Sequence, residues 1–240
     1  MRIYRISQKL KGNYRPSAAA IGLFDGVHLG HQKLLQKALK LARERNIDSA
    51  VITFDPDPVE VYRTNGRLPH LNTARQKYEH FRRIGISRVY VIEFDYVIAS
   101  LSPEAFIDYL NRLNVRELVC GFDFSFGFKG RGNSKILVTS DKRRFNVTII
   151  DSVDHDGRKV SSTRIINELR TGSVETANTL LGYRYEVSDP ERQVIPKDGV
   201  YQGIVNEKPG RITVKDGMII SDKTAENKQD NLSIVFEKRI

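Results

Sequence analysis

Segments of strand-like and helix-like pattern alternate over the first 185 residues, and this alternation limits the fold more than any other feature. Short apolar runs at 17–24, 49–54 and 88–94 are bounded by turn residues, which predicts buried strands. Residues 31–45 place leucines and alanines on one face and lysines on the other, which predicts an amphipathic helix. The other strands expected in this part are at 115–120 and 144–151. The other helices expected are one from Thr73 to Gly85, one that begins at Pro103, a short one from about Ser134, and two at 161–172 and 174–182. Because helices separate the strands, we expect an α/β fold built on a parallel sheet with right-handed crossovers.

The pattern changes after residue 185. From 186 to 240 the chain holds short β-type segments separated by Gly, Pro, Asp and Asn, which is typical of a small all-β unit. We therefore divide the chain into an α/β domain, residues 1–185, and a small β subdomain, residues 186–240. A chain of 240 residues is long enough for one such domain with an appendage.

Composition and charge narrow the class of protein. A hydrophobic fraction of 40% and a mean hydropathy of −0.41 are typical of a soluble globular chain. No apolar run reaches the roughly 18 residues of a membrane span, and the N-terminus has no signal-peptide pattern. A lone cysteine, Cys120, cannot form an internal disulfide, so we expect a cytoplasmic protein.

The net charge of +10 comes from the first 185 residues, because residues 186–240 hold nine Lys and Arg against ten Asp and Glu. Such an excess fits anionic ligands, although a plainly solvated surface explains it equally well.

The first strand-to-helix turn, Gly22–His31, has the sequence GLFDGVHLGH. Parallel sheets bind ligands outside the carboxyl ends of their strands, and three glycines here let the backbone approach a ligand closely. The helix that follows directs free N–H groups at the turn, which favours an anion. His28 and His31 are three residues apart and can both donate hydrogen bonds to phosphate oxygens. A metal site would need a third ligand, and none is suitably placed nearby, so phosphate binding is the preferred interpretation over a metal site or a plain turn.

At these residues the sequence resembles the prokaryotic FAD synthetases, the bifunctional riboflavin kinase/FMN adenylyltransferases. GLFDGVHLGHQKLL resembles their first motif, and H-x-G-H is typical of the nucleotidyltransferase superfamily. The similarity continues, in the family's order, through VITFDPDP (51–58), LSPEAFIDYL (101–110), GFDFSFGFKGRGN (121–133), VSSTRI (160–165) and TANTLLGYRYEV (176–187). The resemblance implies a Rossmann-like nucleotidyltransferase domain that transfers AMP from ATP to FMN, giving FAD and pyrophosphate, with Mg²⁺ brought by ATP.

The resemblance also implies an ATP site in which His28, His31 and Arg164 take part in catalysis. Residues 161–164 match the family's S-S-T motif at a helix start, where hydroxyl and N–H groups suit phosphates, although a plain helix cap would use the same residues. The ATP-binding set implied by the family is Gly22, Phe24, Asp25, Gly26, His28, Gly30, His31, Ser161, Ser162, Thr163 and Arg164.

A second set of residues concerns the flavin. Segment 121–133 alternates aromatic and small residues, and its plainest interpretation is a strand with its phenylalanines in the core. The glycines and basic residues after Phe126 favour a loop instead. The resemblance makes this segment part of the flavin side, and the implied FMN-binding set is Phe54, Asp123, Phe126, Phe128 and Lys129.

Three departures from the family leave alternatives open. Asp57 stands where the family has the His of Pro-His-Pro, and Ile166 where it has a second Arg. The resemblance makes the tail 186–240 a truncated remnant of the family's riboflavin kinase module. It lacks the kinase motif P-T-A-N, so we expect no riboflavin kinase activity. A flavin- or nucleotide-binding regulatory protein with little catalysis, or an adenylyltransferase for another phosphomonoester, remains an alternative. Nucleic acid is not an expected partner, because the basic cluster Lys142–Arg144 has no aromatic platform beside it. The sequence does not indicate the oligomeric state.

Overall fold

The computed structural model describes residues 1–10, 12–61, 68–220 and 232–240, which form two compact units. The sheet unit holds the described residues of Met1–Phe24, His31–Gly66 and Glu79–Ser152. The C-terminal unit holds those of Asp25–Gly30, Arg67–Tyr78 and Val153–Ile240. The boundary expected after residue 185 does not coincide with this division.

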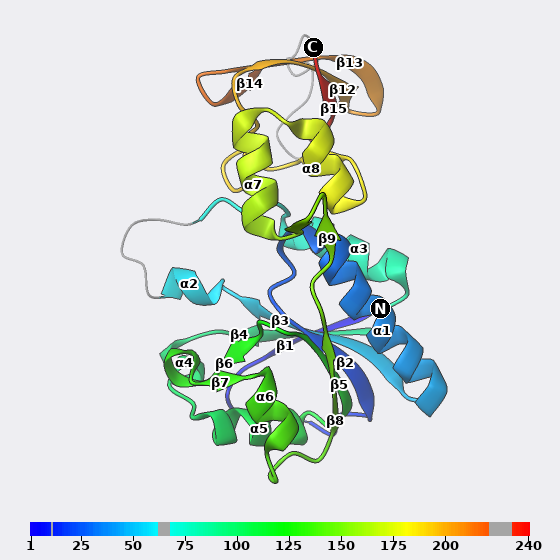
Figure 1. The fold of residues 1–240 in the computed structure, drawn as a ribbon, viewed down its shortest axis with the longest axis vertical. Helices are drawn as coiled ribbons and strands as arrows, with labels where there is room; N and C mark the ends of the chain where they lie inside the picture. The colour runs from blue at the N-terminus through cyan, green and yellow to red at the C-terminus, as the bar shows by residue number, and fades with distance from the viewer. Residues whose placement is uncertain (11, 62–67, 221–231) are drawn as a thin grey trace. The chain divides into compact units, whose positions relative to one another are not determined.

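A six-stranded, fully parallel sheet organises the sheet unit (Figure 1). Its order is β1 (Arg2–Ile6), β4 (Arg88–Glu93), β3 (Asp48–Asp55), β2 (Ser17–Ile21), β5 (Val115–Gly121) and β8 (Asn146–Ile150). The strand order reverses at β2, because β3 lies on one side of it and β5 on the other. This reversal places the topological switch point, where α/β sheets bind ligands, at the carboxyl end of β2. The α/β fold expected from the sequence is confirmed.

Helices cover both faces of this sheet. The α-helices of the unit are α1 (Leu29–Arg45), α2 (Pro58–Val61), α3 (Ala74–Ile84), α4 (Tyr96–Ala99), α5 (Pro103–Arg112) and α6 (Ser134–Thr139), of which α1 and α3 begin within the C-terminal unit. Figure 1 shows α5 and α6 on one face and α1 on the other. The core under α5 joins Phe106 and Leu110 to strand residues such as Ile21 and Leu118, all of them buried. β2 has the sequence SAAAI, and its side chains are buried on both faces, as a central parallel strand requires.

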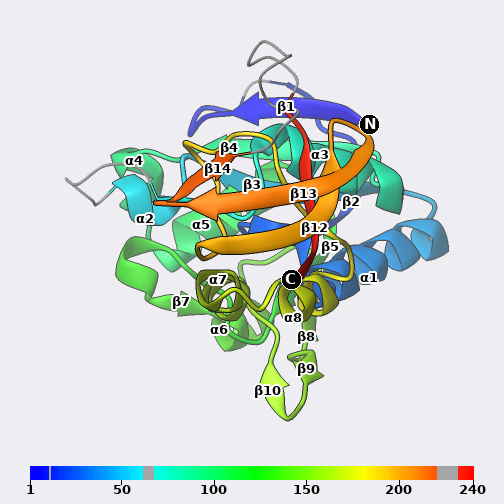
Figure 2. The ribbon, with the colours of Figure 1, turned by 90° about the horizontal axis from the view of Figure 1, so that it is seen from above.

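The C-terminal unit combines two helices with an antiparallel sheet (Figure 2). The helices are α7 (Ser162–Thr171) and α8 (Val174–Leu181), and the sheet order is β11 (Tyr185–Val187), β15 (Ile234–Arg239), β12 (Gly199–Val205), β13 (Lys208–Lys215) and β14 (Met218–Ile220). One apolar cluster joins helix residues such as Leu169 and Leu180 to strand residues such as Tyr201 and Phe236. The all-β tail is therefore confirmed, and the two helices before it share its core.

Short elements complete the description. They are the hairpins β6 (Ser125–Phe126) with β7 (Gly132–Asn133) and β9 (Asp154–His155) with β10 (Arg158–Lys159), and the 3-10 turns Asp25–Val27 and Phe128–Gly130. Among the described residues, no helix has the length and apolar character needed to cross a bilayer.

Candidate functional site

The segment Asp25–Gly30, which follows β2 along the chain, is held within the C-terminal unit by the side chain of Asp25. The side chain of Asp25 is buried, and its Oδ1 accepts hydrogen bonds from the backbone N–H groups of Leu71 (2.9 Å) and Asn72 (3.3 Å). The Nδ1 atom of His70 lies 3.8 Å from the other carboxylate oxygen. The carboxylate of Asp25 therefore holds the turn against residues 70–72, which is a structural role.

Two hydroxyl groups hold the carbonyl oxygens of the same turn. Ser162, at the start of α7, donates from Oγ to the backbone oxygen of Asp25 at 2.9 Å. Tyr183 donates from its phenolic oxygen to the backbone oxygen of Gly26 at 2.6 Å, and the same phenolic oxygen lies 3.2 Å from Oδ1 of Asn72. Burial raises the pKa of Tyr183 above its usual value, so the phenol remains a donor. The turn and the beginning of α7 are thus joined directly.

The backbone of the turn explains its glycines. Gly26 has φ of 77°, and a Cβ atom there would lie 2.6 Å from Cδ1 of Leu71. Gly30 lies under the imidazole of His28, because a Cβ atom on Gly30 would approach Cε1 of that ring to 3.1 Å. Val27 adopts φ of 35°, which is a costly conformation for a β-branched residue and persists only where the surroundings enforce it. The result is a fixed, compact turn with His28 packed over the first residues of α1.

The S-S-T segment is placed at the start of α7, as the sequence indicates. Ser161 caps the helix, since its Oγ accepts from the backbone N–H of Arg164 at 3.2 Å. Thr163 is exposed, whereas the guanidinium of Arg164 is buried. Nη1 of Arg164 donates to the backbone oxygens of His155 (2.9 Å) and Arg158 (2.7 Å). This arginine therefore fixes the β9–β10 hairpin, and its catalytic role stays a prediction.

The remaining ATP-side residues belong to the sheet unit. The backbone N–H of Gly22 donates to the oxygen of Ile52 at 3.1 Å, which continues the sheet one residue beyond β2. Phe24 is fully buried and packs edge-on against His31, with ring centroids 5.2 Å apart, and against Phe81, at 5.6 Å. Phe24 thus supports the ring of His31 and is a core residue itself.

The flavin-side residues lie at the carboxyl edge of the sheet, where parallel strands end together. Phe54 is half-buried near the end of β3 and meets Phe94 edge-on, with centroids 5.8 Å apart. Phe126 is buried against Phe106 at 5.3 Å, so it belongs to the core. Because a buried ring presents little surface, Phe126 is a weaker candidate for flavin stacking than its exposed neighbours.

Phe128 and its basic neighbours form an exposed group after β6. The ring of Phe128 is 37% exposed, with Nζ of Lys129 and Cζ of Arg131 at 5.4 and 5.6 Å from its centroid. Asp123 is exposed as well. The expected loop after Phe126 is present as the hairpin β6–β7 with a 3-10 turn. Its aromatic ring and cations suit an aromatic, anionic ligand.

The two departures near the presumed nucleotide have local explanations. Asp57 accepts from the backbone N–H of Val59 at 2.8 Å and so caps the short helix α2. Ile166 packs against the core of the C-terminal unit. In the described part of the chain, no three His, Cys, Asp or Glu side chains are placed to hold a metal ion together.

The sequence analysis missed Tyr183 and the segment 70–72. Tyr183 lies in TANTLLGYRYEV, a segment that contributes to the family resemblance, but a tyrosine there carries no local pattern that identifies its acceptor.

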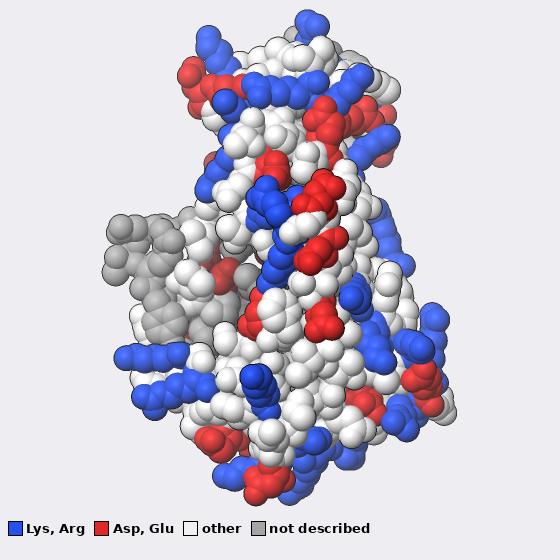
Figure 3. Space-filling model, viewed as in Figure 1, with Lys and Arg blue, Asp and Glu red and all other residues white. Residues whose placement is uncertain are grey.

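Figure 3 shows one face of the molecule, on which Lys and Arg are dispersed and many have Asp or Glu close by. That face fits a solvated surface.

A parallel sheet whose switch-point strand leads into a glycine- and histidine-containing turn is typical of Rossmann-like nucleotidyltransferase domains. The FAD synthetase family model matches residues 10–164 of this chain. This chain belongs to the FAD synthetase family.

Relatives agree with this assignment. The chain is 40% identical over 168 residues to a bifunctional riboflavin kinase/FMN adenylyltransferase of Listeria monocytogenes, covering 69% of this chain and 54% of that protein. It is 38% identical over 178 residues to the Bacillus subtilis protein of the same name, covering 73% and 56%. The chain thus spans about half the length of these relatives. A protein named FAD synthetase, also from Listeria monocytogenes, is 32% identical over 225 residues, covering 85% and 88%.

A solved structure shares the fold. The crystal structure titled Macrolide-efflux Protein from Streptococcus pneumoniae superimposes with a TM-score of 0.84 over 99% of this chain and 90% of that one. Its sequence identity is 23%, so the likeness concerns the fold alone.

Proposed function

We propose that this chain is an FMN adenylyltransferase, which transfers AMP from ATP to FMN and releases FAD and pyrophosphate. The observation that carries the proposal is the hydrogen bond from Ser162 Oγ to the backbone oxygen of Asp25. It joins two segments that lie 137 residues apart in the sequence and that the family resemblance assigns, independently, to the ATP phosphates.

The chemistry asks little of the protein beyond alignment and charge neutralisation. A phosphate monoester has a second pKa near 6, so the FMN phosphate is mostly dianionic at neutral pH and can attack the α-phosphorus of ATP without a protein base. In the proposed reaction His28, His31 and the first N–H groups of α1 and α7 contact the ATP phosphates. Phe54, Phe128, Lys129 and Asp123 contact FMN.

Mg²⁺ enters the proposal as part of the ATP complex. The described residues include no cluster of ligands for a resident ion, whereas Mg²⁺ is commonly held by substrate phosphates and water. When bound, it neutralises phosphate charge. We further propose that residues 1–240 carry no riboflavin kinase activity, because the P-T-A-N segment is absent from the sequence, and that the protein acts in the cytoplasm.

The test is an incubation of the purified chain with Mg²⁺ and ATP, plus FMN or riboflavin, followed by chromatography of the flavins. FAD from FMN and no phosphorylated flavin from riboflavin is the expected result. His31→Ala should reduce turnover by about 10²-fold, the usual effect of removing one transition-state donor. His80→Ala, which changes a histidine in α3, is the matched control. Turnover of His31→Ala equal to that of the control would remove His31 from the mechanism.

One observation favours the regulatory alternative. Nη1 of Arg164 donates to two backbone oxygens, and Nε of the same buried side chain lies 3.9 Å from Oε1 of Glu168, so this arginine offers a phosphate fewer donors and less unpaired charge than an exposed one would. A chain that binds FMN, as quenching of flavin fluorescence would show, but forms no FAD would support that alternative. A chain that forms no FAD and binds no FMN, but adenylylates another phosphomonoester, would support a different transferase.

A further inference from the structure

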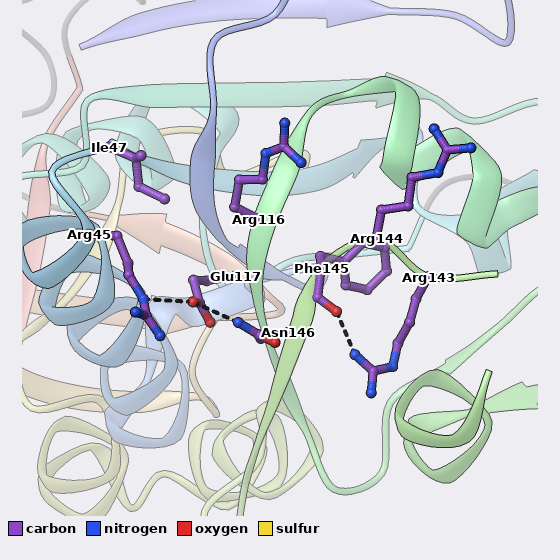
Figure 4. Close-up of a pocket in the computed structure, with 8 residues that line it drawn as sticks. All are labelled: Arg45, Ile47, Arg116, Glu117, Arg143, Arg144, Phe145 and Asn146. Atoms are coloured by element: carbon purple, nitrogen blue, oxygen red, sulfur yellow. Dashed lines mark hydrogen bonds and ion pairs between the residues drawn. The ribbon is translucent and has the colours of Figure 1, made fainter. Parts of the chain in front are cut away.

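A basic cavity lies at the amino-terminal edge of the parallel sheet (Figure 4). It has a volume of about 530 Å³ and is formed where β5 and β8 begin and α1 ends. The candidate residues of the sheet unit follow the carboxyl ends of the strands, so the cavity lies at the opposite edge. The charged and polar side chains that decide its character are Arg45, Arg116, Glu117, Arg143, Arg144 and Asn146.

Two of the four arginines are engaged in fixing the walls. Nε of Arg45 lies 3.0 Å from Oε1 of Glu117, whose side chain is 6% exposed. Nδ2 of Asn146 donates to the same oxygen at 3.0 Å, so Oε1 of Glu117 accepts from two walls of the cavity. Nη1 of Arg143 donates to the backbone oxygen of Phe145, two residues further along the chain, at 2.7 Å.

The other two arginines are available to a ligand. Among the described residues, the guanidinium groups of Arg116 and Arg144 make no hydrogen bond and no ion pair, and both residues are exposed. Figure 4 shows both side chains extending toward the top of the view, Arg116 from β5 and Arg144 from the segment before β8, whereas Arg143 extends the opposite way. Glu117 pairs with Arg45, and within the described part of the chain no ion pair joins Arg116, Arg143 or Arg144 to an acidic side chain.

These groups select the chemistry of the ligand. Guanidinium groups bind phosphate oxygens with two parallel hydrogen bonds, and arginine is preferred over lysine where that geometry matters. The volume is in the usual range of about 300–1,000 Å³ for small-molecule sites. Among the described residues that line the cavity the aromatic side chain is Phe145, and because it is buried it offers no exposed face on which a base or a flavin could stack. A compact, highly charged anion fits these features best.

We propose that this cavity binds a small polyphosphate anion through Arg116 and Arg144. Pyrophosphate is the probe, and the readout is the backbone amide resonances of residues 116–117 and 143–146 in the ¹⁵N-labelled chain, which report on this cavity alone. Saturable shifts of these resonances are expected. The double variant Arg116→Gln/Arg144→Gln should weaken the binding they report by about tenfold or more, since each lost charge-assisted hydrogen bond changes affinity by that order.

Two further variants control the experiment. Arg2→Gln/Arg43→Gln removes the same charge from exposed arginines of the sheet unit outside the cavity, and it should leave the dissociation constant within about twofold, because screened surface charges contribute little. Glu117→Gln keeps the side-chain shape and frees the charge of Arg45, so it should tighten binding.

Three results would overturn the proposal. The first is the absence of saturable shifts at these resonances in the unaltered chain at millimolar pyrophosphate. The second is an equal loss of affinity in the control pair, which would show a general charge effect. The third is tighter binding of a short single-stranded oligonucleotide at the same resonances, which would identify a nucleic-acid site. Resonances of Gly26–Gly30 are followed separately, so failure of the ATP site leaves this test unaffected.

Discussion

The Tyr183→Phe variant removes one hydroxyl group and leaves the aromatic ring in place. In the structure that hydroxyl donates to the backbone oxygen of Gly26 at 2.6 Å and lies 3.2 Å from Oδ1 of Asn72. The variant leaves the Gly26 oxygen without its donor. An unsatisfied buried polar group costs about 1–3 kcal/mol, so we expect the free energy of unfolding to fall by about that amount.

The same change should loosen the turn and thereby affect ATP more than FMN. If Tyr183 positions the turn, the KM for ATP rises and kcat falls, while the KM for FMN changes little, because the flavin-side residues belong to the sheet unit. The assay is steady-state FAD formation with each substrate varied in turn. Hydrogen exchange of the Gly26–Gly30 amides provides a readout that does not depend on activity, and their protection should decrease.

Tyr201→Phe is the matched control. Its hydroxyl donates to the backbone oxygen of Lys197, in the same unit, and the charged groups that act on it are Arg239, Asp198 and Glu175, none of which belongs to the turn. This control should lose comparable stability and keep both KM values. If Tyr183→Phe and Tyr201→Phe give the same kinetic constants and the same exchange of the turn amides, the positioning argument is wrong and Tyr183 contributes to stability alone.

The remaining predictions concern stability and reactivity. Gly26→Ala should lower the midpoint of thermal unfolding by several degrees, because its Cβ would lie 2.6 Å from Cδ1 of Leu71 at φ of 77°; an unchanged midpoint would show that the turn adapts without cost. Burial raises the pKa of Cys120 to about 11, so the native thiol should resist alkylation at pH 8 and react only after unfolding; rapid labelling of the folded chain would contradict its burial. Backbone N–H groups of Gly217 and Asp216 lower the pKa of Asp198 below its ordinary value of 3.8. The carboxylate therefore stabilises the fold above that value and loses this contribution as the pH falls through the lowered pKa, so Asp198→Asn should differ most from the unaltered chain at neutral pH and least in acid, in denaturant titrations at several pH values.

The parallel sheet was predictable because its strands are short apolar runs between breakers. The strand expected at 17–24 ends at Ile21, since Phe24 turns with φ of 57°, which an apolar run does not reveal. The first strand, Arg2–Ile6, was missed because two arginines interrupt its apolar residues and leave neither an apolar run nor a regular alternation. The strand lies at the edge of the sheet, where it pairs with β4, so it need not be apolar on both faces. Local pattern therefore finds central strands better than edge strands.

The division of the chain was harder to predict than its elements. The helices at 162–171 and 174–181 were expected and are present. Their apolar faces pack into the core of the C-terminal unit, with Leu169 and Leu180 in one cluster with Phe236. Periodicity shows that a helix has an apolar face, but it does not show which sheet that face covers. The composition changes at residue 185, after both helices, although these helices pack with the sheet that follows them. The position of that change was therefore a poor guide to the compact units.

Motif positions were likewise easier to predict than side-chain directions. Phe126 and Arg164 stand where the family resemblance puts ligand contacts, yet Phe126 is buried and the guanidinium of Arg164 binds two backbone oxygens. Asp57 and Ile166, which depart from the family, cap a helix and fill a core. The direction of a side chain depends on the neighbours that the tertiary fold places around it, and a single sequence does not show which neighbours these are.

These assignments change where the charge of the proposed reaction is neutralised. Because Nη1 of Arg164 is held by two backbone oxygens, the proposed contacts to the ATP phosphates come mainly from the two histidines, the helix N–H groups and the metal that accompanies ATP. Backbone donors keep a fixed position only if the turn that carries them is rigid, and they contribute most when no reorganisation is needed at the moment of reaction. The anchors of the turn, Asp25, Ser162 and Tyr183, are therefore as important to the proposed chemistry as the histidines, although none of the three needs to touch ATP.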